Sequence, residues 1–245
     1  PPLRRAKPAE VDLEHCNGCA RCAEDCPYEA IRMVRRTDGM PFPTQAQVST
    51  SLCVSCGICV GSCPSSTPFR RTEELKTGID LPDFRLKELR ERTVAVAGEL
   101  KGPGRVLVLA CEHGCAGSRE SGVVKLPCAA MAPPSLIDYI LSKKLADGVV
   151  VAGCAESYGY NRLGVQWTED RFAARRDPYL RARVPRERVK TIWASSLETN
   201  RFETELAAFT AKMALLPAEP ARPLESPPPS GAQPIPASAE EASPA

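Results

Sequence analysis

The sequence lacks several features that would assign it to a common functional class. Its 245 residues contain 32 Lys and Arg against 30 Asp and Glu, a net charge of +2, so no excess charge favours nucleic acid or a membrane surface. No run approaches the ~18 apolar residues that a membrane-spanning helix needs. No glycine-rich nucleotide fingerprint or P-loop occurs. We therefore expect no membrane span, no nucleic-acid partner and no tightly bound flavin or nicotinamide.

Catalytic side chains are also scarce. The chain has two histidines, His15 and His113, and no recognisable pairing of a nucleophile with a base. Both histidines lie beside cysteines. A histidine replaces thiolate ligands in Rieske centres, but the cysteines here suffice as ligands, so we interpret both as neighbours of a metal site. The sequence predicts no catalytic residue and a subunit that is not itself catalytic.

Cysteine, in contrast, is abundant, with 12 residues. Eight of them form two copies of the run C-x2-C-x2-C-x3-C-P, beginning at Cys16 and Cys53. In such a run three thiolates reach three corners of a cubane cluster, and the fourth cysteine ligates the other cluster. The spacing predicts two [4Fe-4S] clusters, one held by Cys16, Cys19, Cys22 and Cys63 and the other by Cys53, Cys56, Cys59 and Cys26.

Zinc and disulfides are the alternatives to iron-sulfur clusters for these eight cysteines. Zinc sites use C-x2-C pairs that lie far apart, and disulfides need an oxidising compartment, for which the sequence gives no signal. The stretch resembles the bacterial two-cluster ferredoxin domain over roughly residues 8–70. We expect a cytoplasmic protein that reaches a membrane, if at all, peripherally through a partner.

The composition divides the chain into five segments. We predict a linker at residues 1–8 and a two-cluster ferredoxin-like α+β domain at 9–70. A connecting helix and linker follow at 71–103, then a small parallel-sheet α/β domain at 104–216 and a disordered Pro/Ala-rich tail at 217–245. The connecting helix is expected at Asp83–Ala97. Ser195 and Glu198 predict a capping box that starts a last helix, with Leu197 on its apolar face.

The α/β domain carries the other four cysteines next to its predicted strands. Short apolar runs predict parallel strands at Val106–Ala110, Val123–Leu126, Gly148–Ala152 and Val189–Ala194. Cys111 and Cys115 follow the first strand, Cys128 the second and Cys154 the third. The carboxyl ends of parallel strands meet at one edge, where ligands bind. We therefore predict that these four thiols hold a [2Fe-2S] cluster or a structural zinc, and the nearby redox clusters favour [2Fe-2S].

The same motifs resemble a known family. The motifs that carry this resemblance are Val108–Cys115, Leu126–Cys128, Gly148–Cys154 and Tyr160–Arg162. Over roughly residues 104–215, the sequence is similar to the delta subunit of methyl-viologen-reducing hydrogenase. The resemblance implies an electron-transfer domain with a [2Fe-2S] cluster. Such proteins connect a hydrogenase, formate dehydrogenase or similar partner to a flavoprotein of the heterodisulfide-reductase type. The sequence departs from the family at Glu112 and Gly159, where cysteines often stand.

Three functions fit these observations. The first is an electron-transfer subunit that relays single electrons between a dehydrogenase or hydrogenase and a flavoprotein. The second is an iron-sulfur subunit that feeds a membrane cytochrome and the quinone pool. The third is a ferredoxin with a zinc-binding or redox-sensing C-terminal interaction module. An arginine-rich run between Arg162 and Arg188 either docks an acidic partner or forms a solvated surface.

Overall fold

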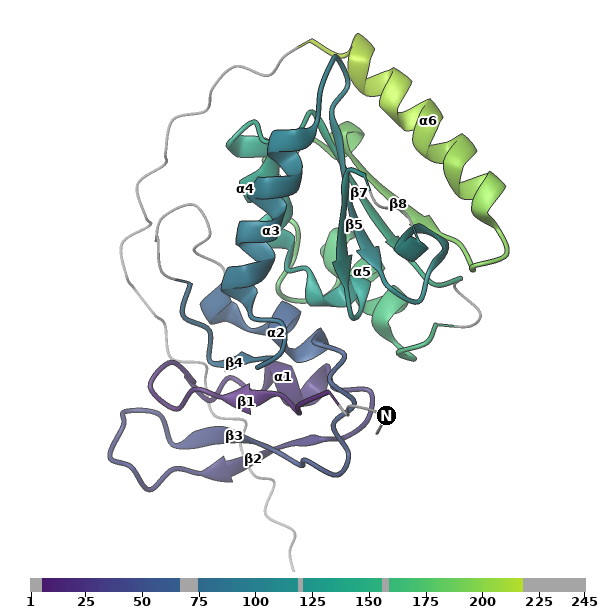
Figure 1. The fold of residues 1–245 in the computed structure, drawn as a ribbon. Helices are drawn as coiled ribbons and strands as arrows, with labels where there is room; N and C mark the ends of the chain where they lie inside the picture. The colour runs from purple at the N-terminus through teal and green to yellow at the C-terminus, as the bar shows by residue number, and fades with distance from the viewer. Residues whose placement is uncertain (1–5, 67–74, 119–120, 156–158, 218–245) are drawn as a thin grey trace, which may run out of the picture.

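The structure is a computed structural model that describes residues 6–66, 75–118, 121–155 and 159–217. It contains an N-terminal domain rich in short strands and a larger α/β domain, which pack directly against each other (Figure 1). This arrangement confirms the predicted fold class. Most of the N-terminal linker and the Pro/Ala-rich tail lie outside the described residues. Within those residues no helix combines the length and apolar character needed to cross a bilayer.

The N-terminal domain is built on two antiparallel strand pairs. Strand β1 (Glu10–Val11) pairs with β4 (Ile79–Asp80), and β2 (Ile31–Arg35) pairs with β3 (Thr44–Val48). The sequence predicts the first strand of each pair, around Glu10–Leu13 and Ile31–Val34, and a turn at Thr37–Thr44. Strand β3, which begins at Thr44, was not predicted; three of its five residues are Thr or Gln.

Two short helices lie within the cysteine runs, between the strands and the α/β domain (Figure 1). They are α1 (Arg21–Glu24) and α2 (Ile58–Ser62), and the one-turn 3-10 helix η1 (Pro64–Ser66) follows α2. The proline after the last cysteine of each run cannot continue a helix, which keeps both helices short.

Helix α3 (Leu86–Glu99) links the two domains. It begins three residues later than predicted and extends beyond Ala97. Asp80, at the end of β4, accepts the backbone N–H of Leu86 at 3.1 Å and that of Leu81 at 2.9 Å, so a carboxylate from outside the helix satisfies its first donor. Leu86 and Leu89 are fully buried. The buried face of α3 therefore belongs to the common core.

Burial of Asp80 predicts a pH dependence of stability. Burial raises the pKa of Asp80 to about 6, against its two backbone hydrogen bonds. A raised pKa means that the folded state holds the proton more tightly, so the stability from this group is present below about pH 4 and lost as the pH rises through about 6. Asp80→Asn should reduce the pH dependence of the guanidinium unfolding midpoint between pH 4.5 and 7. Asp83 is an exposed carboxylate nearby, and Asp83→Asn should leave that pH dependence unchanged. If the wild type and both variants showed the same change of midpoint with pH, the prediction would be contradicted.

The α/β domain contains a four-stranded parallel sheet in the order β6-β5-β7-β8. The strands are β5 (Val106–Cys111), β6 (Val123–Leu126), β7 (Gly148–Gly153) and β8 (Val189–Trp193). Each lies within one residue of its predicted bounds. The two central strands, β5 and β7, are continuous runs of buried residues, as expected for a parallel sheet covered on both faces.

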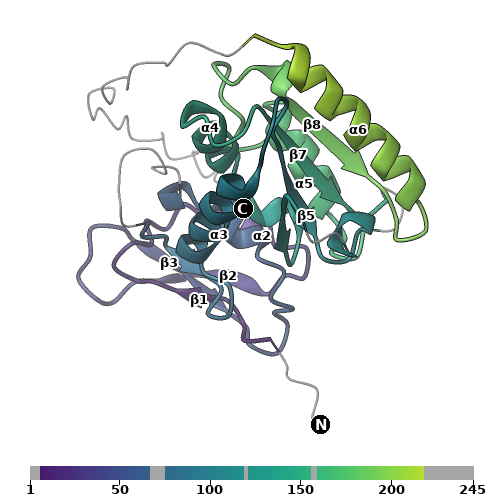
Figure 2. The ribbon, with the colours of Figure 1, turned by 45° about the horizontal axis from the view of Figure 1, so that its top comes forward.

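Helices cover both faces of this sheet (Figures 1 and 2). Helix α4 (Pro134–Ser142) packs with α3 on one face and α6 (Thr199–Leu215) on the other, while α5 (Gly164–Phe172) lies toward the N-terminal domain. Three short 3-10 helices connect these elements, η2 (Cys115–Ser118), η3 (Ala129–Met131) and η5 (Arg186–Arg188). Alternate strand residues divide between two cores, so Leu107 and Leu109 face α3 and α4, and Val106 and Val108 face α6.

The start of α6 differs from the prediction. Glu198 accepts hydrogen bonds from both the backbone N–H and the hydroxyl of Ser195, each at 2.8 Å, but the helix begins only at Thr199. Leu197 therefore precedes the helix and is 93% exposed. The prediction that it belongs to the apolar face was wrong.

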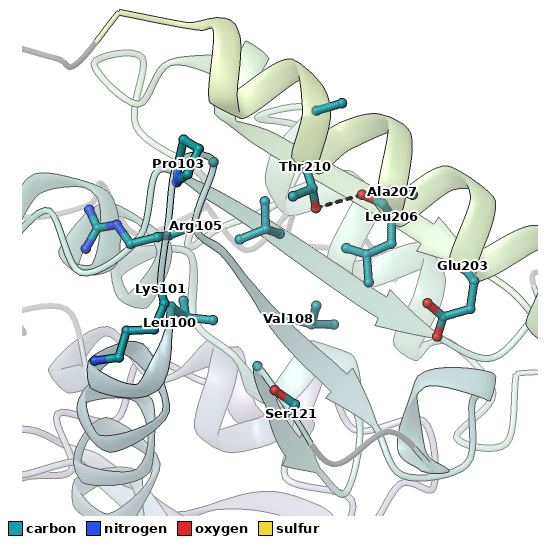
Figure 3. Close-up of a pocket in the computed structure, with 14 residues that line it drawn as sticks. Leu100, Lys101, Pro103, Arg105, Val108, Ser121, Glu203, Leu206, Ala207 and Thr210 are labelled. Carbon is teal, nitrogen blue, oxygen red and sulfur yellow. Dashed lines mark hydrogen bonds between the residues drawn. The ribbon is translucent and has the colours of Figure 1, made fainter.

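A cavity of about 550 Å³ opens between α6 and the sheet edge (Figure 3). Val108 and Leu206 form its apolar floor, and Lys101, Arg105 and Glu203 bring charge to its rim. No cysteine is among its described lining residues. The cavity is therefore separate from the predicted metal ligands.

Candidate metal centres

The first predicted ligand set lines one cavity. Cys16, Cys19, Cys22 and Cys63 all line one small pocket whose other walls include Met33, Ala46 and Ile79. Burial, reinforced by the charges of the neighbouring thiols, raises the pKa of Cys22 to about 12. Four sulfurs around an apolar hollow fit a bound cluster, because metal coordination would supply the positive charge that thiolates need there. Cys19 is the exposed member of this set.

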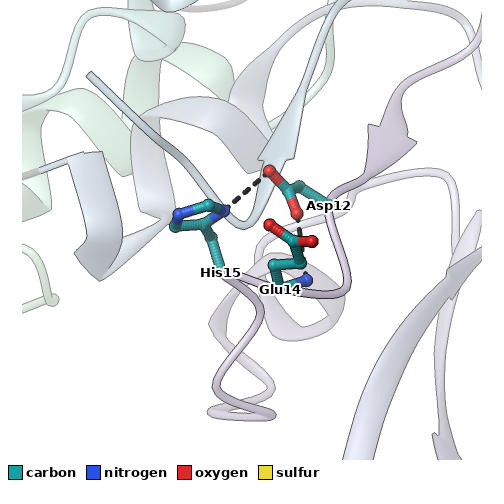
Figure 4. A group of neighbouring side chains, drawn as sticks. All are labelled: Asp12, Glu14 and His15. Atoms are coloured by element: carbon teal, nitrogen blue, oxygen red, sulfur yellow. Dashed lines mark hydrogen bonds and ion pairs between the residues drawn. The ribbon is translucent and has the colours of Figure 1, made fainter. Parts of the chain in front are cut away.

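A polar group lies beside this first site (Figure 4). His15 Nδ1 is 2.8 Å from Asp12 Oδ2, and the donor atoms of Asp12, Glu14 and His15 lie within 4.8 Å of one another. Asp12 and Glu14 are exposed. His15, which precedes Cys16, is thus paired with the carboxylate of Asp12. It lies beside the predicted metal site, as we expected.

The second predicted ligand set also comes together. The charges of Cys53, Cys56 and Cys26 act on Cys59, whose pKa is raised well above its usual value mainly by burial. Backbone N–H groups face two of these sulfurs, from Ala9 to Cys53 Sγ and from Ala30 to Cys26 Sγ, both at 3.4 Å. Cys26 comes from the other run, as the exchange of fourth ligands requires. The donors fit a cubane, whose sulfurs accept such hydrogen bonds.

In the α/β domain, Cys111 and Cys154 lie side by side at the carboxyl edge of the sheet. Their sulfurs are 3.8 Å apart, and the Cys111 thiol is 3.6 Å from the carbonyl oxygen of Pro127. The hydrogen bond between the two sulfurs lowers the pKa of Cys154 and raises that of Cys111. One of the two thiols is therefore prepared to ionise.

Cys128 is close to this pair and is 4% exposed. Burial raises its pKa to about 11, while a hydrogen bond from the Asn161 side chain acts in the opposite direction. A Cβ at Gly164 would lie 2.5 Å from Cys128 Sγ, so only glycine leaves room for the sulfur here. The charges of Cys111 and Cys154 both interact with that of Cys128.

Cys115 is placed apart from these three cysteines. It begins η2, its backbone N–H donates to the carbonyl of Ala194, and it packs with Ala116 and Phe202 in the core under α6. Cys111 and Cys154 belong to the core on the other face. The structure thus brings three of the four predicted ligands together, and Cys115 would have to move to join them.

The distances also bear on zinc. Tetrahedral zinc with Zn–S bonds of about 2.3 Å places its sulfurs roughly 3.8 Å apart. Across the described residues, which include all twelve cysteines, no three sulfurs lie within 4.8 Å of one another. The sulfurs of Cys111 and Cys154, which are 3.8 Å apart, match this separation as a pair.

His113 is the nitrogen donor near the α/β thiols. Its ring stacks on Tyr160 at 3.6 Å, and the backbone of Tyr160 hydrogen bonds to Cys154. Its imidazole charge also acts on Cys154. His113 is therefore a neighbour of the site, as we interpreted it. The sequence places Tyr158 and Tyr160 near Cys154, where we expect them to shield the cluster from water; Tyr158 lies outside the described residues.

The second ligand set and the α/β thiols share one packed cluster. Cys56 and Ile58 from the first domain contact Cys128, Ala130 and Trp167 from the second. Burial raises the pKa of Cys56, and among the neighbouring thiols Cys128 has the largest electrostatic effect in the same direction. The two sites are thus adjacent across the domain interface.

A buried ion pair holds this interface. Asp25, which precedes Cys26, accepts hydrogen bonds from Arg171 and, at 2.6 Å, from Arg176 Nε. Arg171 is 1% exposed. This pair was not predicted, because we expected the arginine-rich run to lie on the surface. Arg162, from the same run, also donates to the first domain, at the carbonyl of Pro27. The polar spacing of the run gave no signal that its members point inward.

Comparisons with known proteins agree with this architecture. Residues 15–67 match the family model of the 4Fe-4S dicluster domain, and residues 105–216 match that of the methyl-viologen-reducing hydrogenase delta subunit. The chain thus contains a region similar to a 4Fe-4S dicluster domain, followed by a region similar to a hydrogenase delta subunit, and we call it the dicluster–delta chain. A stretch of 29 residues is 52% identical to pyruvate synthase subunit PorD of Methanothermobacter marburgensis, covering 12% of this chain and 36% of that subunit. The matched stretch spans about a third of the length of this curated relative.

Proposed function

We propose that this dicluster–delta chain relays single electrons through two [4Fe-4S] clusters and a third centre in the α/β domain. The clusters, when bound, accept and release one electron at a time. Cys16, Cys19, Cys22 and Cys63 hold the first cubane and Cys26, Cys53, Cys56 and Cys59 the second. Cys111, Cys128 and Cys154 contribute ligands to the third centre, a [2Fe-2S] cluster, whereas Cys115, the other predicted ligand, packs under α6 and is not assigned to it.

The packing of Cys56 against Cys128 carries this proposal. Cys56 and Cys128, predicted ligands of the second cubane and of the third centre, lie in one packed cluster with Ile58, Ala130 and Trp167, which supports direct transfer between the two sites. Buried apolar contacts exclude water and keep the separation of the two sites fixed. The exposed position of Cys19 leaves the first cubane nearest to solvent, where a partner can approach.

The partners follow from the families of the two domains. We propose that the chain connects a dehydrogenase or hydrogenase to a flavoprotein of the heterodisulfide-reductase type. Delivery to a membrane cytochrome is the alternative. Purification from the native host should retain these partners, and haem in the purified complex would favour the cytochrome.

The thiol pair favours a second candidate function. Cys111 and Cys154, with sulfurs 3.8 Å apart, could form a disulfide after a small movement. The release of two electrons and two protons would make the α/β domain a thiol redox module served by the cubanes. A third metal centre and a disulfide between these residues exclude each other.

Metal and thiol analysis of anaerobically purified protein separates these functions. The relay predicts roughly ten irons per chain and no zinc; a zinc module predicts about eight irons and one zinc. The dithiol module predicts about eight irons, no zinc, and two thiols that become unreactive on oxidation. Protein that contains no iron would contradict the whole proposal.

A further inference from the structure

The ion pair beside the second cubane contains more positive than negative charge. Two guanidinium groups, Arg171 and Arg176, share the single carboxylate of Asp25, which is 2% exposed. Arg176 also stacks on Trp167 at 3.5 Å and retains some solvent contact. Arg171 retains almost none. A buried cation without full compensation is costly, so a nearby negative charge is expected.

Arg171 has one donor that the described structure does not satisfy. Its Nη1 donates to the carbonyl of Ala130 at 2.8 Å and its Nη2 binds Asp25, while its buried Nε has no hydrogen-bond partner. Such orphan donors are rare in folded proteins and call for an explanation. A bound ligand with a hydrogen-bond acceptor near this Nε would provide that explanation.

The surroundings of Arg171 identify where that ligand belongs. Its guanidinium lies against α2, because a Cβ at Gly61 would be only 2.9 Å from its Nη1. Gly61 stands between Cys59 and Cys63, and Asp25 adjoins Cys26. On the other side, the charge of Arg171 acts on Cys128. The cation therefore lies between the second cubane site and the α/β thiols.

We propose that Arg171 sets the reduction potential of the second cubane, as a buried cation that stabilises its reduced form without ligating it. This inference rests on the proposed relay. A thiolate-bound cubane is anionic and becomes more so when it gains an electron, so a fixed positive charge nearby favours the reduced state. Burial strengthens this effect, because little water screens Arg171.

The chain provides a matched comparison at the first cubane. Arg36 is also buried there, donating to the carbonyl of Cys16 at 2.7 Å, but it pairs one-to-one with Asp38. That pair leaves no surplus charge. The two cubanes therefore differ in their electrostatic surroundings, and charge changes at the two arginines should act on different clusters.

An EPR-monitored redox titration of the full chain tests the inference. Arg171→Gln should lower the midpoint of one cubane enough to reduce its reduced-to-oxidised ratio about tenfold at fixed potential, or 59 mV for a one-electron couple. Asp25→Asn should raise the same midpoint, because it removes negative charge. Arg171→Lys should shift it less than Arg171→Gln. Arg36→Gln should move only the other cubane.

The opposite signs separate charge from structure. If Arg171→Gln and Asp25→Asn shift the midpoint in the same direction, or leave it unchanged with full iron content, the inference is wrong. If Arg171→Gln loses iron, the midpoints of Arg171→Lys and Asp25→Asn are compared instead. Shifts of these two midpoints in the same direction would then show that the inference is wrong. Wild-type protein without two cubane signals would instead overturn the proposed function.

Discussion

Gly61→Ala is expected to part the two domains of the dicluster–delta chain and to slow electron transfer between them. A Cβ at this position would lie 2.1 Å from the carbonyl oxygen of Ala130 and 3.0 Å from that of Met131. Both are backbone atoms, so no side chain can rotate away. Helix α2 and η3 would have to separate, which overpacking at a buried contact makes unfavourable by about 1–3 kcal/mol.

Two measurements check this expectation. The guanidinium midpoint, followed by visible absorbance, should fall, and reduction of the third centre after rapid reduction of the cubanes should slow at least severalfold. Gly98→Ala is the matched control, because its Cβ meets nothing within 4 Å on the exposed face of α3. Alanine there should stabilise the helix by about 0.5–1 kcal/mol. If Gly61→Ala behaved like Gly98→Ala, the interface would not be the electron path.

The cysteine spacing predicted the first domain well because its information is local. Three predicted ligands of each cubane lie within seven consecutive residues, and the predicted exchange of Cys26 and Cys63 follows from the same repeat. The position of Cys111, Cys128 and Cys154 was predictable for a related reason. Each follows a strand, and parallel strands bring their carboxyl ends together whatever the helices do.

Cys115 and Arg171 show where this reasoning stops. Three residues separate Cys115 from the end of β5, and a tight turn with Gly114 N–H bonded to the carbonyl of Cys111 sends it toward α6 instead. Spacing does not specify which face a residue takes after such a turn. Arg171 meets Asp25 from 146 positions away. No local pattern distinguishes this buried arginine from Arg175, which follows α5, is exposed and pairs with Asp170 of that helix.

Cys128→Ala is expected to abolish the third centre while sparing both cubanes. Its sulfur lies in the pocket that Gly164 leaves open and contacts the cluster of residues around Cys56. Removing this thiolate should lower the iron content by roughly two per chain and eliminate the [2Fe-2S] EPR signal. The cubane signals should remain, since no cubane ligand changes.

Cys115→Ala is the matched variant, because it removes an equally buried thiol from the same domain. Cys115 is 4% exposed, as Cys128 is, but packs under α6 with Ala116 and Phe202. Its loss should cost stability as a small apolar truncation in a core does, by about 1 kcal/mol or more, and leave iron content and the EPR signal intact. Equal iron loss in the two variants would show that Cys115 moves to the site when the cluster binds. Retention of the signal in both would assign the third centre to other ligands, with His113 beside Cys154 the first to test by mutation to alanine.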